Sequence, residues 1–251
     1  MMKTSSFSEL KSHPQKSLLK HLIEVSTFSQ NTISSKKLNF PHVDHQTIEK
    51  IAFIIGASHD FGKSTPFFQE YINEKTNEKQ RAILKNKSVT KHGKLSAVFT
   101  YFLLKEYLKD RKDIQADLPI FGFLIVKRHH GNLKNPVSEL IDFNDDGVTV
   151  LNEQIRSIVS NPDNLSQIVK IYQKILPEFD VSPFFEEMNS LIKEIKRRKT
   201  PFREFLENEQ SLEYYVIFQL LYSTLINSDK LDAAGLISSL NNKIQNPIDE
   251  Q

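Results

Sequence analysis

Apolar residues recur along most of the chain with the three- and four-residue spacing of helices that bury one face. Leu18, Leu22 and Val25 show this spacing in a helix that Pro14 is expected to open, and Thr47 is expected to cap the next one. The same periodicity predicts helices over residues 14–29, 47–58, 92–109, 118–129, 148–160, 164–176, 183–198 and 211–229. The pattern is therefore typical of an all-α protein.

Alternation of the kind that marks strands is rare. Residues 121–126 and 148–151 could form short strands, but neither segment alternates for long. Residues 131–147 are rich in glycine, asparagine and aspartate, which predicts a long loop. The sequence contains no internal repeat and no clear linker, so we expect a single domain over residues 1–251.

Composition excludes several kinds of functional site. The chain of 251 residues contains no cysteine, which excludes disulfides, thiolate-bound metals and a thiol nucleophile. Lys and Arg number 33 against 31 Asp and Glu, so a nucleic acid would need a local basic patch. No apolar run approaches the ~20 residues of a membrane span, and the N-terminus lacks a signal-peptide pattern. We therefore expect a soluble cytoplasmic protein without membrane contact.

Histidines occupy the inner faces and the ends of several predicted helices. His21 lies between Leu18 and Val25 on a buried face, and His59 follows Ile55 by one helical turn. Comparable positions are held by His92, His129, His130 and Asp229. A buried imidazole or carboxylate is costly without a partner, so such groups pair or bind metal. Each residue alone is more often a satisfied core or capping residue, but the whole set favours a metal site.

Two adjacent pairs strengthen this prediction, namely His59-Asp60 and His129-His130. Neighbouring side chains in a regular helix diverge by about 100°, so both reach one site only where the helix ends. Gly62 and Gly131 are expected to supply that break. A carboxylate shared between two imidazole-rich sites can bridge two divalent ions suited to phosphodiester hydrolysis. Mixed nitrogen and oxygen ligands favour Mn, Fe, Co, Ni or Zn over Mg or Ca, with one or two ions bound.

The ordered motifs resemble the HD phosphohydrolase superfamily, and within it the HD nuclease of type I CRISPR systems. They run from His21 through SHDFGKSTPFFQEYI, KHGKLSAVF and KRHHGNL to NSDKLDAAG. A His-Asp pair alone is a weak signal, whereas the continuation GKSTPFFQ and the His-His-Gly run are characteristic of this branch. The resemblance extends from His21 to about Gly235. It implies one HD domain whose metal-binding core lies in about residues 14–235.

The resemblance also implies a role for each matched residue. One metal ion would be bound by His21, His59, Asp60 and Asp229. A second ion would share the aspartate and be bound by Asp60, His92, His129 and His130. The expected catalytic residues are Asp60 and Lys63, with Lys63 meeting a phosphate oxygen. The alternative for Lys63 is a solvated lysine in a turn.

Basic residues lie beside the predicted ligands and indicate a local surface for nucleic acid. The usual meaning of such charges is a solvated helix face, but these are tied in sequence to the site. The candidates for phosphate contacts are Lys63, Lys91, Lys94, Lys127 and Arg128. A cleft between helices admits one strand more easily than a duplex, so we expect a single-stranded substrate.

The run Gly62-Lys63-Ser64-Thr65 is not the end of a nucleoside-triphosphate loop. That loop requires a glycine at position 57, where this chain has Ala57. Thr65 followed by Pro66 instead indicates the start of a helix. A helicase motor would therefore have to be a separate protein.

The leading hypothesis is a metal-dependent endo- or exonuclease that cleaves single-stranded DNA, or RNA, in CRISPR interference. Its expected partners are the nucleic acid, a separate CRISPR helicase and a CRISPR target-recognition complex. One alternative keeps the chemistry but acts on nucleotides or cyclic nucleotides. The other is a non-catalytic HD module that binds a partner, although such a module need not retain the full ligand set.

Overall fold

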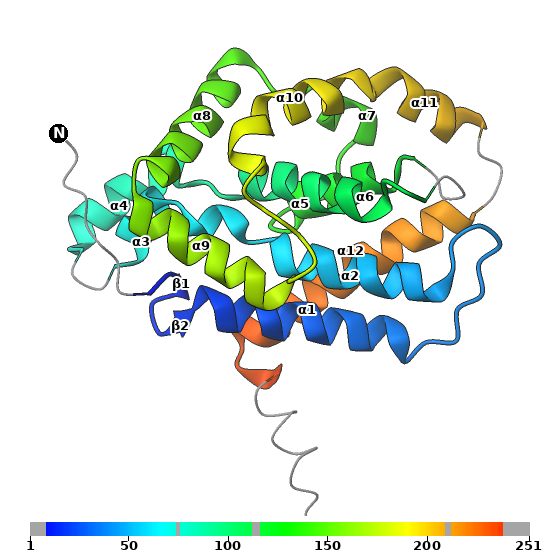
Figure 1. Ribbon diagram of the computed structural model, residues 1–251, viewed down its shortest axis with the longest axis horizontal. Helices are drawn as coiled ribbons and strands as arrows, with labels where there is room; N and C mark the ends of the chain where they lie inside the picture. The colour runs from blue at the N-terminus through cyan, green and yellow to red at the C-terminus, as the bar shows by residue number, and fades with distance from the viewer. Residues whose placement is uncertain (1–8, 74–75, 112–115, 209–211, 238–251) are drawn as a thin grey trace, which may run out of the picture.

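The computed structural model describes residues 9–73, 76–111, 116–208 and 212–237. Within these ranges the protein is mainly α-helical, as the periodicity predicts (Figure 1). The described strands are β1 (Lys11–His13) and β2 (Lys16–Ser17), which form a small antiparallel hairpin. Residues 121–126 and 148–151 are helical, so the strand interpretation is wrong. A short apolar run does not distinguish a strand from a helix that is buried on all sides.

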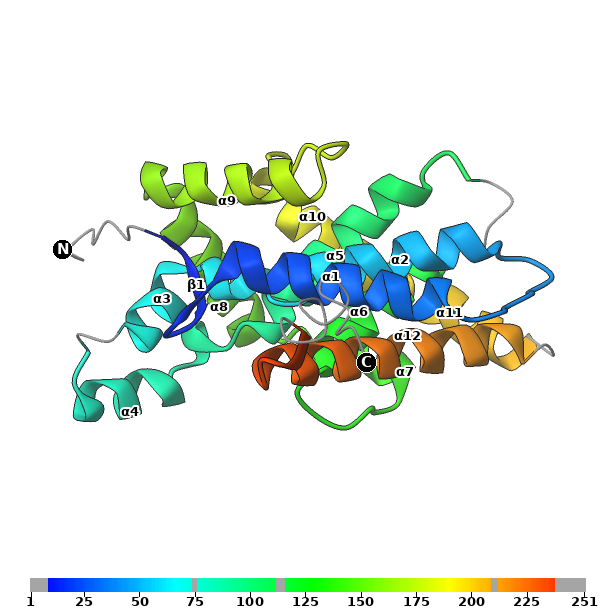
Figure 2. The ribbon, with the colours of Figure 1, turned by 90° about the horizontal axis from the view of Figure 1, so that it is seen from below.

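Five helices build the centre of the protein. They are α1 (Leu18–Ser34), α2 (His45–Ser58), α5 (Gly93–Leu108), α6 (Leu118–Arg128) and α12 (Glu213–Ala233). Helix α2 packs against α1 and α5, α5 packs against α6, and α12 contacts α1, α2 and α6. Figure 2 shows α12 running along α1, although the two helices lie at opposite ends of the sequence.

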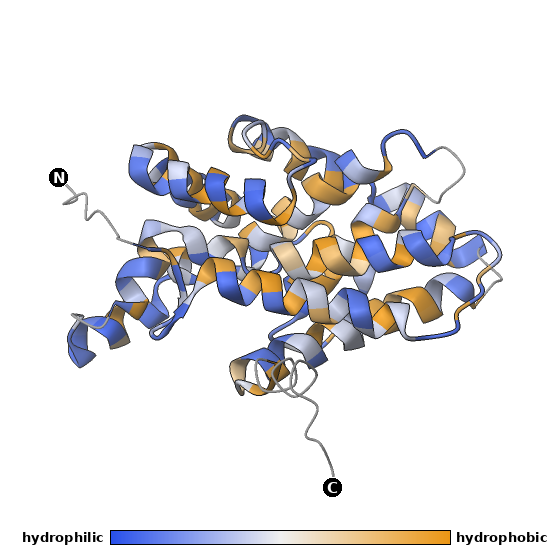
Figure 3. Cartoon of the chain, turned by 60° about the horizontal axis from the view of Figure 1, so that its bottom comes forward, coloured by the Kyte–Doolittle hydropathy of each residue, from blue (hydrophilic) through white to orange (hydrophobic). Residues whose placement is uncertain are grey.

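The remaining helices cover this centre. They are α3 (Pro66–Ile72), α4 (Glu78–Asn86), α7 (Pro136–Glu139), α8 (Asp145–Val159), α9 (Pro162–Ile175), α10 (Phe184–Arg197) and α11 (Lys199–Asn208), with the 3₁₀ helices η1 (Phe61–Ser64) and η2 (Ser88–Thr90). They mix hydrophilic and hydrophobic positions (Figure 3). The periodicity did not predict α4 and α11, because each buries only one residue, Leu84 and Phe202 respectively. None of the described helices is long and apolar enough to cross a membrane.

Capping side chains set the helix starts and correct two expectations. Ser17 caps α1 by accepting from the Lys20 N–H at 3.2 Å, whereas Pro14 lies in the turn between β1 and β2. Asp44, not Thr47, caps α2: it accepts from the Thr47 N–H at 2.9 Å and from its hydroxyl at 2.7 Å. A side-chain oxygen directly before the helix satisfies the N–H groups of its first turn, which Thr47 inside the turn cannot do.

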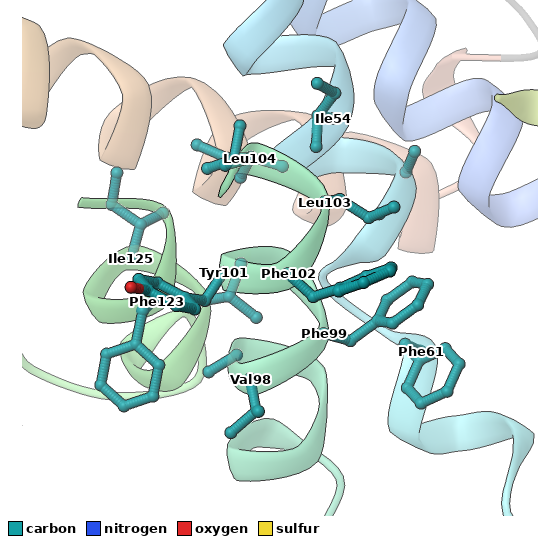
Figure 4. Close-up of a cluster of buried hydrophobic side chains, with 14 of the residues drawn as sticks. Ile54, Phe61, Val98, Phe99, Tyr101, Phe102, Leu103, Leu104, Phe123 and Ile125 are labelled. Atoms are coloured by element: carbon teal, nitrogen blue, oxygen red, sulfur yellow. The ribbon is translucent and has the colours of Figure 1, made fainter. Parts of the chain in front are cut away.

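An aromatic cluster connects the core to the candidate site. Phe61 is fully buried, and its ring stacks on that of Phe99 with centroids 3.9 Å apart (Figure 4). The rings of Tyr172 and Phe184 contact the same pair. Phe61 follows Asp60 directly in the chain, so this packing fixes the position of the Asp60 backbone.

Candidate metal centre

Asp60 lies at the centre of a cluster of buried polar side chains, in the turn between α2 and η1. Its Oδ2 atom is 2.9 Å from Nε2 of His21 and 3.4 Å from Nε2 of His59. Its Oδ1 atom is 3.1 Å from Nε2 of His92 and 3.6 Å from Nε2 of His129. Each carboxylate oxygen therefore faces a different pair of imidazoles, which is the arrangement of a bridging ligand.

The first set of ligand atoms gathers side chains from α1, α12 and the end of α2. The Nε2 atoms of His21 and His59 are 3.3 Å apart. Oδ1 of Asp229 lies 3.7 Å from the His21 Nε2 and 3.5 Å from that of His59. With Asp60, one ligand atom from each of these residues lies within 4.8 Å of all the others.

The second set lies on the other side of the same aspartate. His92 directly precedes α5, while His129 and His130 directly follow α6. The Nε2 atoms of His92 and His130 are 2.8 Å apart. Ligand atoms of these three histidines and Asp60 also lie within 4.8 Å of one another. The structure thus brings together all seven residues expected to bind metal, in the two groups that the resemblance implies.

Hydrogen bonds on the far side of three rings select the tautomer that binds metal. Nδ1 of His59 donates to the Gly56 carbonyl at 2.8 Å, and Nδ1 of His129 donates to the Val126 carbonyl at 2.6 Å. Nδ1 of His21 donates to Oδ2 of Asp232 at 2.6 Å. Because these partners accept hydrogen bonds, the proton stays on Nδ1 and Nε2 is directed at the site.

The surroundings of Asp60 and His130 keep these two ligands ready for a cation. Burial raises the pKa of Asp60, but the Lys63 ammonium and the nearby imidazoles outweigh it and hold this pKa well below its usual range. Burial and the neighbouring His129 and His92 lower the pKa of His130 to about 3. Near neutral pH, Asp60 is therefore ionised and His130 is neutral.

Two buried atoms support the assignment of a metal centre. Oδ1 of Asp60 and Nε2 of His129 are buried and have no hydrogen-bond partner among the described residues. A buried acceptor without a donor is costly, and a cation between the two atoms removes that cost. The donor set of imidazole nitrogen and carboxylate oxygen fits Mn, Fe, Co, Ni or Zn. The residues present therefore fit a divalent transition metal.

Gly62 allows the chain after Asp60 to approach the start of α5. A Cβ atom on Gly62 would lie 2.5 Å from the His92 carbonyl oxygen, and its N–H donates to Oγ of Ser96 at 2.9 Å. The expected helix breaks are present, since α2 ends at Ser58 and α6 at Arg128, but neither glycine adopts a positive φ: among the described residues only Gly235 does. The helix ends instead in a tight right-handed turn, and Gly62 is needed for space.

Lys63 is buried and directed into the site, so it is not a solvated lysine in a turn. Its Nζ atom lies 2.7 Å from Oδ2 of Asp60, and its side chain is 7% exposed. The ammonium group balances the charge of the carboxylate at the centre of both ligand sets. Its contact with a phosphate oxygen stays a prediction.

Asp232 is a residue of the site that the sequence interpretation missed. It is buried beneath His21 and pairs with Lys16, which also pairs with Glu24 at 2.6 Å. Burial lowers the pKa of His21, but hydrogen bonds to Asp232 and Asp60 outweigh it, and the pKa rises to about 9. The signal in the sequence is the Asp229-to-Asp232 spacing, which places both on one face of α12.

The β1–β2 hairpin, residues 11–17, also closes over the site. The buried Gln69 bonds to both the N–H and the carbonyl of Lys11, at 2.9 and 2.8 Å, and to the Lys63 carbonyl at 2.7 Å. The ring of His13 meets that of His21 edge-on, with centroids 5.5 Å apart. His13 therefore lies beside the centre, although its sequence surroundings are loop-like.

Three of the basic residues predicted to contact nucleic acid form ion pairs with acidic residues at and after the end of α7. Lys127 is 3.0 Å from Glu139 and 3.2 Å from Asp142, with a 3% exposed side chain. Arg128 bonds to both carboxylate oxygens of Glu139, and Lys94 pairs with Asp142. Lys91 is exposed beside His92. Contacts of these residues with nucleic acid stay a prediction.

Comparison with known proteins identifies the family. A model of the family described as "Cas3, HD domain" matches residues 7–169. The CRISPR-associated nuclease/helicase Cas3 of Haloferax volcanii is 28% identical over 134 residues, which are 52% of this chain and only 13% of that relative. The solved CRISPR-associated Cas3 HD domain protein of Methanocaldococcus jannaschii shares the fold, with a TM-score of 0.51 and 15% identity over 89% of this chain and 100% of that chain. The family match covers more than half of the sequence, and we conclude that the protein belongs to the Cas3 HD-domain family.

Proposed function

We propose that this protein is a metal-dependent nuclease that hydrolyses phosphodiester bonds of single-stranded DNA. The observation that carries the proposal is the buried Asp60, whose two carboxylate oxygens each face a separate set of histidine ligand atoms. Hydrolytic sites with two metals hold them about 3.5–4 Å apart, a separation that one carboxylate bridges. A shared aspartate within two nitrogen-rich sets is the arrangement that this chemistry needs.

Each side chain has a separate task in the proposed reaction. Divalent ions at this centre would supply an activated water and a positive charge for the leaving oxygen. Asp60 and the histidine Nε2 atoms would hold the ions, and hydrogen bonds on the far sides of the rings fix His21, His59 and His129. Lys63 presents its ammonium group beside Asp60, where it holds a non-bridging phosphate oxygen. Burial of Asp60 and Lys63 keeps these charges effective by limiting their contact with bulk water.

The proposed setting is CRISPR interference in the cytoplasm. The relative from Haloferax volcanii is named a nuclease/helicase, and this chain matches 13% of its length. We infer that a helicase supplies single-stranded DNA and that a target-recognition complex selects the duplex. Mn, Co, Ni, Fe or Zn would support activity better than Mg.

The test is cleavage of circular single-stranded DNA by the purified chain with Mn, Co or Ni. We expect linear and then shorter products from the wild type and no products from Asp60→Asn. The matched control is Asp180→Asn, which changes an exposed aspartate and should cleave like the wild type. Intact DNA with all three metals would refute the proposal, and hydrolysis of cyclic nucleotides instead would favour the phosphohydrolase alternative.

A further inference from the structure

A cavity opens beside the candidate metal centre and contacts both ligand sets. Its volume is about 450 Å³, and its wall includes His130 of the second set and Asp229 of the first. This volume lies within the range of about 300–1,000 Å³ that is typical of small-molecule sites. A group bound there would lie directly next to a phosphate held at the centre.

One face of α12 forms a wall of this cavity. Tyr222, Ile226 and Lys230 line it and are spaced by four residues, so they project from successive turns of the helix. The hydroxyl of Tyr222 donates to the Gly131 carbonyl at 2.9 Å. That bond fixes the tyrosine ring against the segment that follows His130, with the ring partly exposed.

Lys230 gives the cavity an available positive charge. It is exposed at the end of this face and forms no ion pair with the acidic side chains that the structure describes. This differs from Lys94, Lys127 and Arg128, whose charges are paired with Glu139 or Asp142. An aromatic ring, an aliphatic side chain and a nearby ammonium group are the elements of a subsite for one nucleotide.

We propose that this cavity binds the nucleotide next to the scissile phosphate, with its base against Tyr222 and Ile226 and its outer phosphate near Lys230. This inference rests on the proposed nuclease function and deepens it. A base in a duplex is stacked and paired, and it would have to leave the helix to enter the cavity. The cavity thus selects a single strand without reading its sequence, because every base has a face that stacks.

The test compares two substrates on the same metal-loaded protein. One is a single-stranded oligonucleotide, and the other is bis(p-nitrophenyl) phosphate, a small diester that needs the metal centre but carries no base. We expect Tyr222→Leu to lower the ratio of oligonucleotide cleavage to diester hydrolysis about tenfold, which corresponds to the loss of one stacking contact. Lys230→Gln should lower it severalfold, and Tyr222→Phe, which keeps the ring, should change it less than Tyr222→Leu.

The matched controls replace an exposed tyrosine and an exposed lysine that lie outside the cavity. Tyr215→Leu changes an exposed tyrosine earlier on α12, and Lys170→Gln changes an exposed lysine on α9. Neither residue lines the cavity, so both variants should keep the wild-type ratio. An unchanged ratio in Tyr222→Leu and Lys230→Gln would overturn the proposal. Equal loss of both activities in Tyr222→Leu, together with loss of bound metal, would also overturn it, because Tyr222 would then act only by holding the 130–131 segment.

A binding measurement separates this proposal from the proposed function. Fluorescence anisotropy of a labelled oligonucleotide in EDTA reports binding without catalysis. If the wild type hydrolyses neither substrate, the nuclease function fails, and weaker binding by Tyr222→Leu and Lys230→Gln than by the two controls would still support the subsite. Equal binding by all variants would reject it.

Discussion

Nδ1 of His21 lies 2.6 Å from Oδ2 of Asp232, although the two residues are 211 positions apart in the chain. This bond joins α1 to α12 at the candidate metal centre. It fixes the His21 ring so that Nε2 faces Asp60, and it places a buried negative charge behind a residue proposed to bind metal. Asp232 thus supports the centre without being one of its ligands.

Replacing Asp232 should weaken metal binding more than it weakens the fold. Asp232→Asn keeps the shape of the side chain but removes its charge, and its amide nitrogen cannot accept from His21. We expect affinity for Mn to fall about 10- to 100-fold, the usual effect of removing such a partner. Isothermal titration calorimetry of the metal-free protein measures this directly. An affinity equal to that of the wild type would show that Asp232 has no positioning role.

Gly62 and Gly131 should respond differently to an added methyl group. A Cβ on Gly62 would meet backbone atoms of His92 at 2.5 and 2.9 Å, whereas a Cβ on Gly131 would meet nothing within 4 Å. We expect Gly62→Ala to destabilise the protein by about 1–3 kcal/mol and to displace His92 from the second ligand set. Thermal unfolding and the number of metal ions bound are the measurements. Gly131→Ala is the control and should keep the wild-type melting temperature. If the two variants behaved alike, Gly62 would not be required for the close approach to His92.

Gln69 should hold the hairpin in place. Gln69→Leu removes all three hydrogen bonds that connect Lys11 to the Lys63 carbonyl while keeping a side chain of similar size. Because the Lys63 carbonyl loses a partner in a buried setting, we expect a loss of about 1–3 kcal/mol in unfolding free energy. Hydrogen exchange should become faster at residues 11–17 and remain unchanged in α9. Unchanged exchange in the hairpin would show that other contacts hold it.

The Asp44 cap should give α2 a pH-dependent stability. Burial raises the pKa of Asp44, but bonds to Thr47 and Arg111 outweigh it and lower the pKa to about 2. Because the pKa of Asp44 is lower in the folded protein than its usual value of 3.8, ionised Asp44 stabilises the fold at pH values above 3.8. This stabilisation is lost as the pH falls towards 2.

We therefore expect Asp44→Ala to cost about 1 kcal/mol at pH 7, the usual effect of losing an N-cap. The difference from the wild type should shrink between pH 4 and pH 2. Urea unfolding at a series of pH values measures both effects, and a constant difference across this range would exclude the ionised cap as its cause.

Much of the fold and of the site could be predicted because their signals are local. The three- and four-residue periodicity of α8, α9 and α10 follows from one face of each helix packing on the core. Likewise, the pairs His59-Asp60 and His129-His130 lie at helix ends that the sequence marks. Resemblance then supplied the grouping of the ligands, which helix periodicity alone leaves open.

The features that could not be predicted depend on partners far away in the sequence. Glu139 and Asp142 lie in a segment whose sequence indicates only a loop. They nevertheless form ion pairs with Lys127 and Arg128, so the positive charges of these two residues are already paired within the protein. The β1–β2 hairpin is too short to alternate detectably. Its position depends on Gln69 and Asp232, which are distant from it in the chain.

Helix α12 supplies both Asp229 and Asp232, while the other ligands come from segments that are translated much earlier. A ribosome-bound chain that has not yet released α12 therefore lacks Asp229 of the first set. It also lacks Asp232, which holds the ring of His21. Such a nascent chain lacks the complete centre, so the proposed DNA-cutting activity would arise only once the polypeptide has been made through this helix.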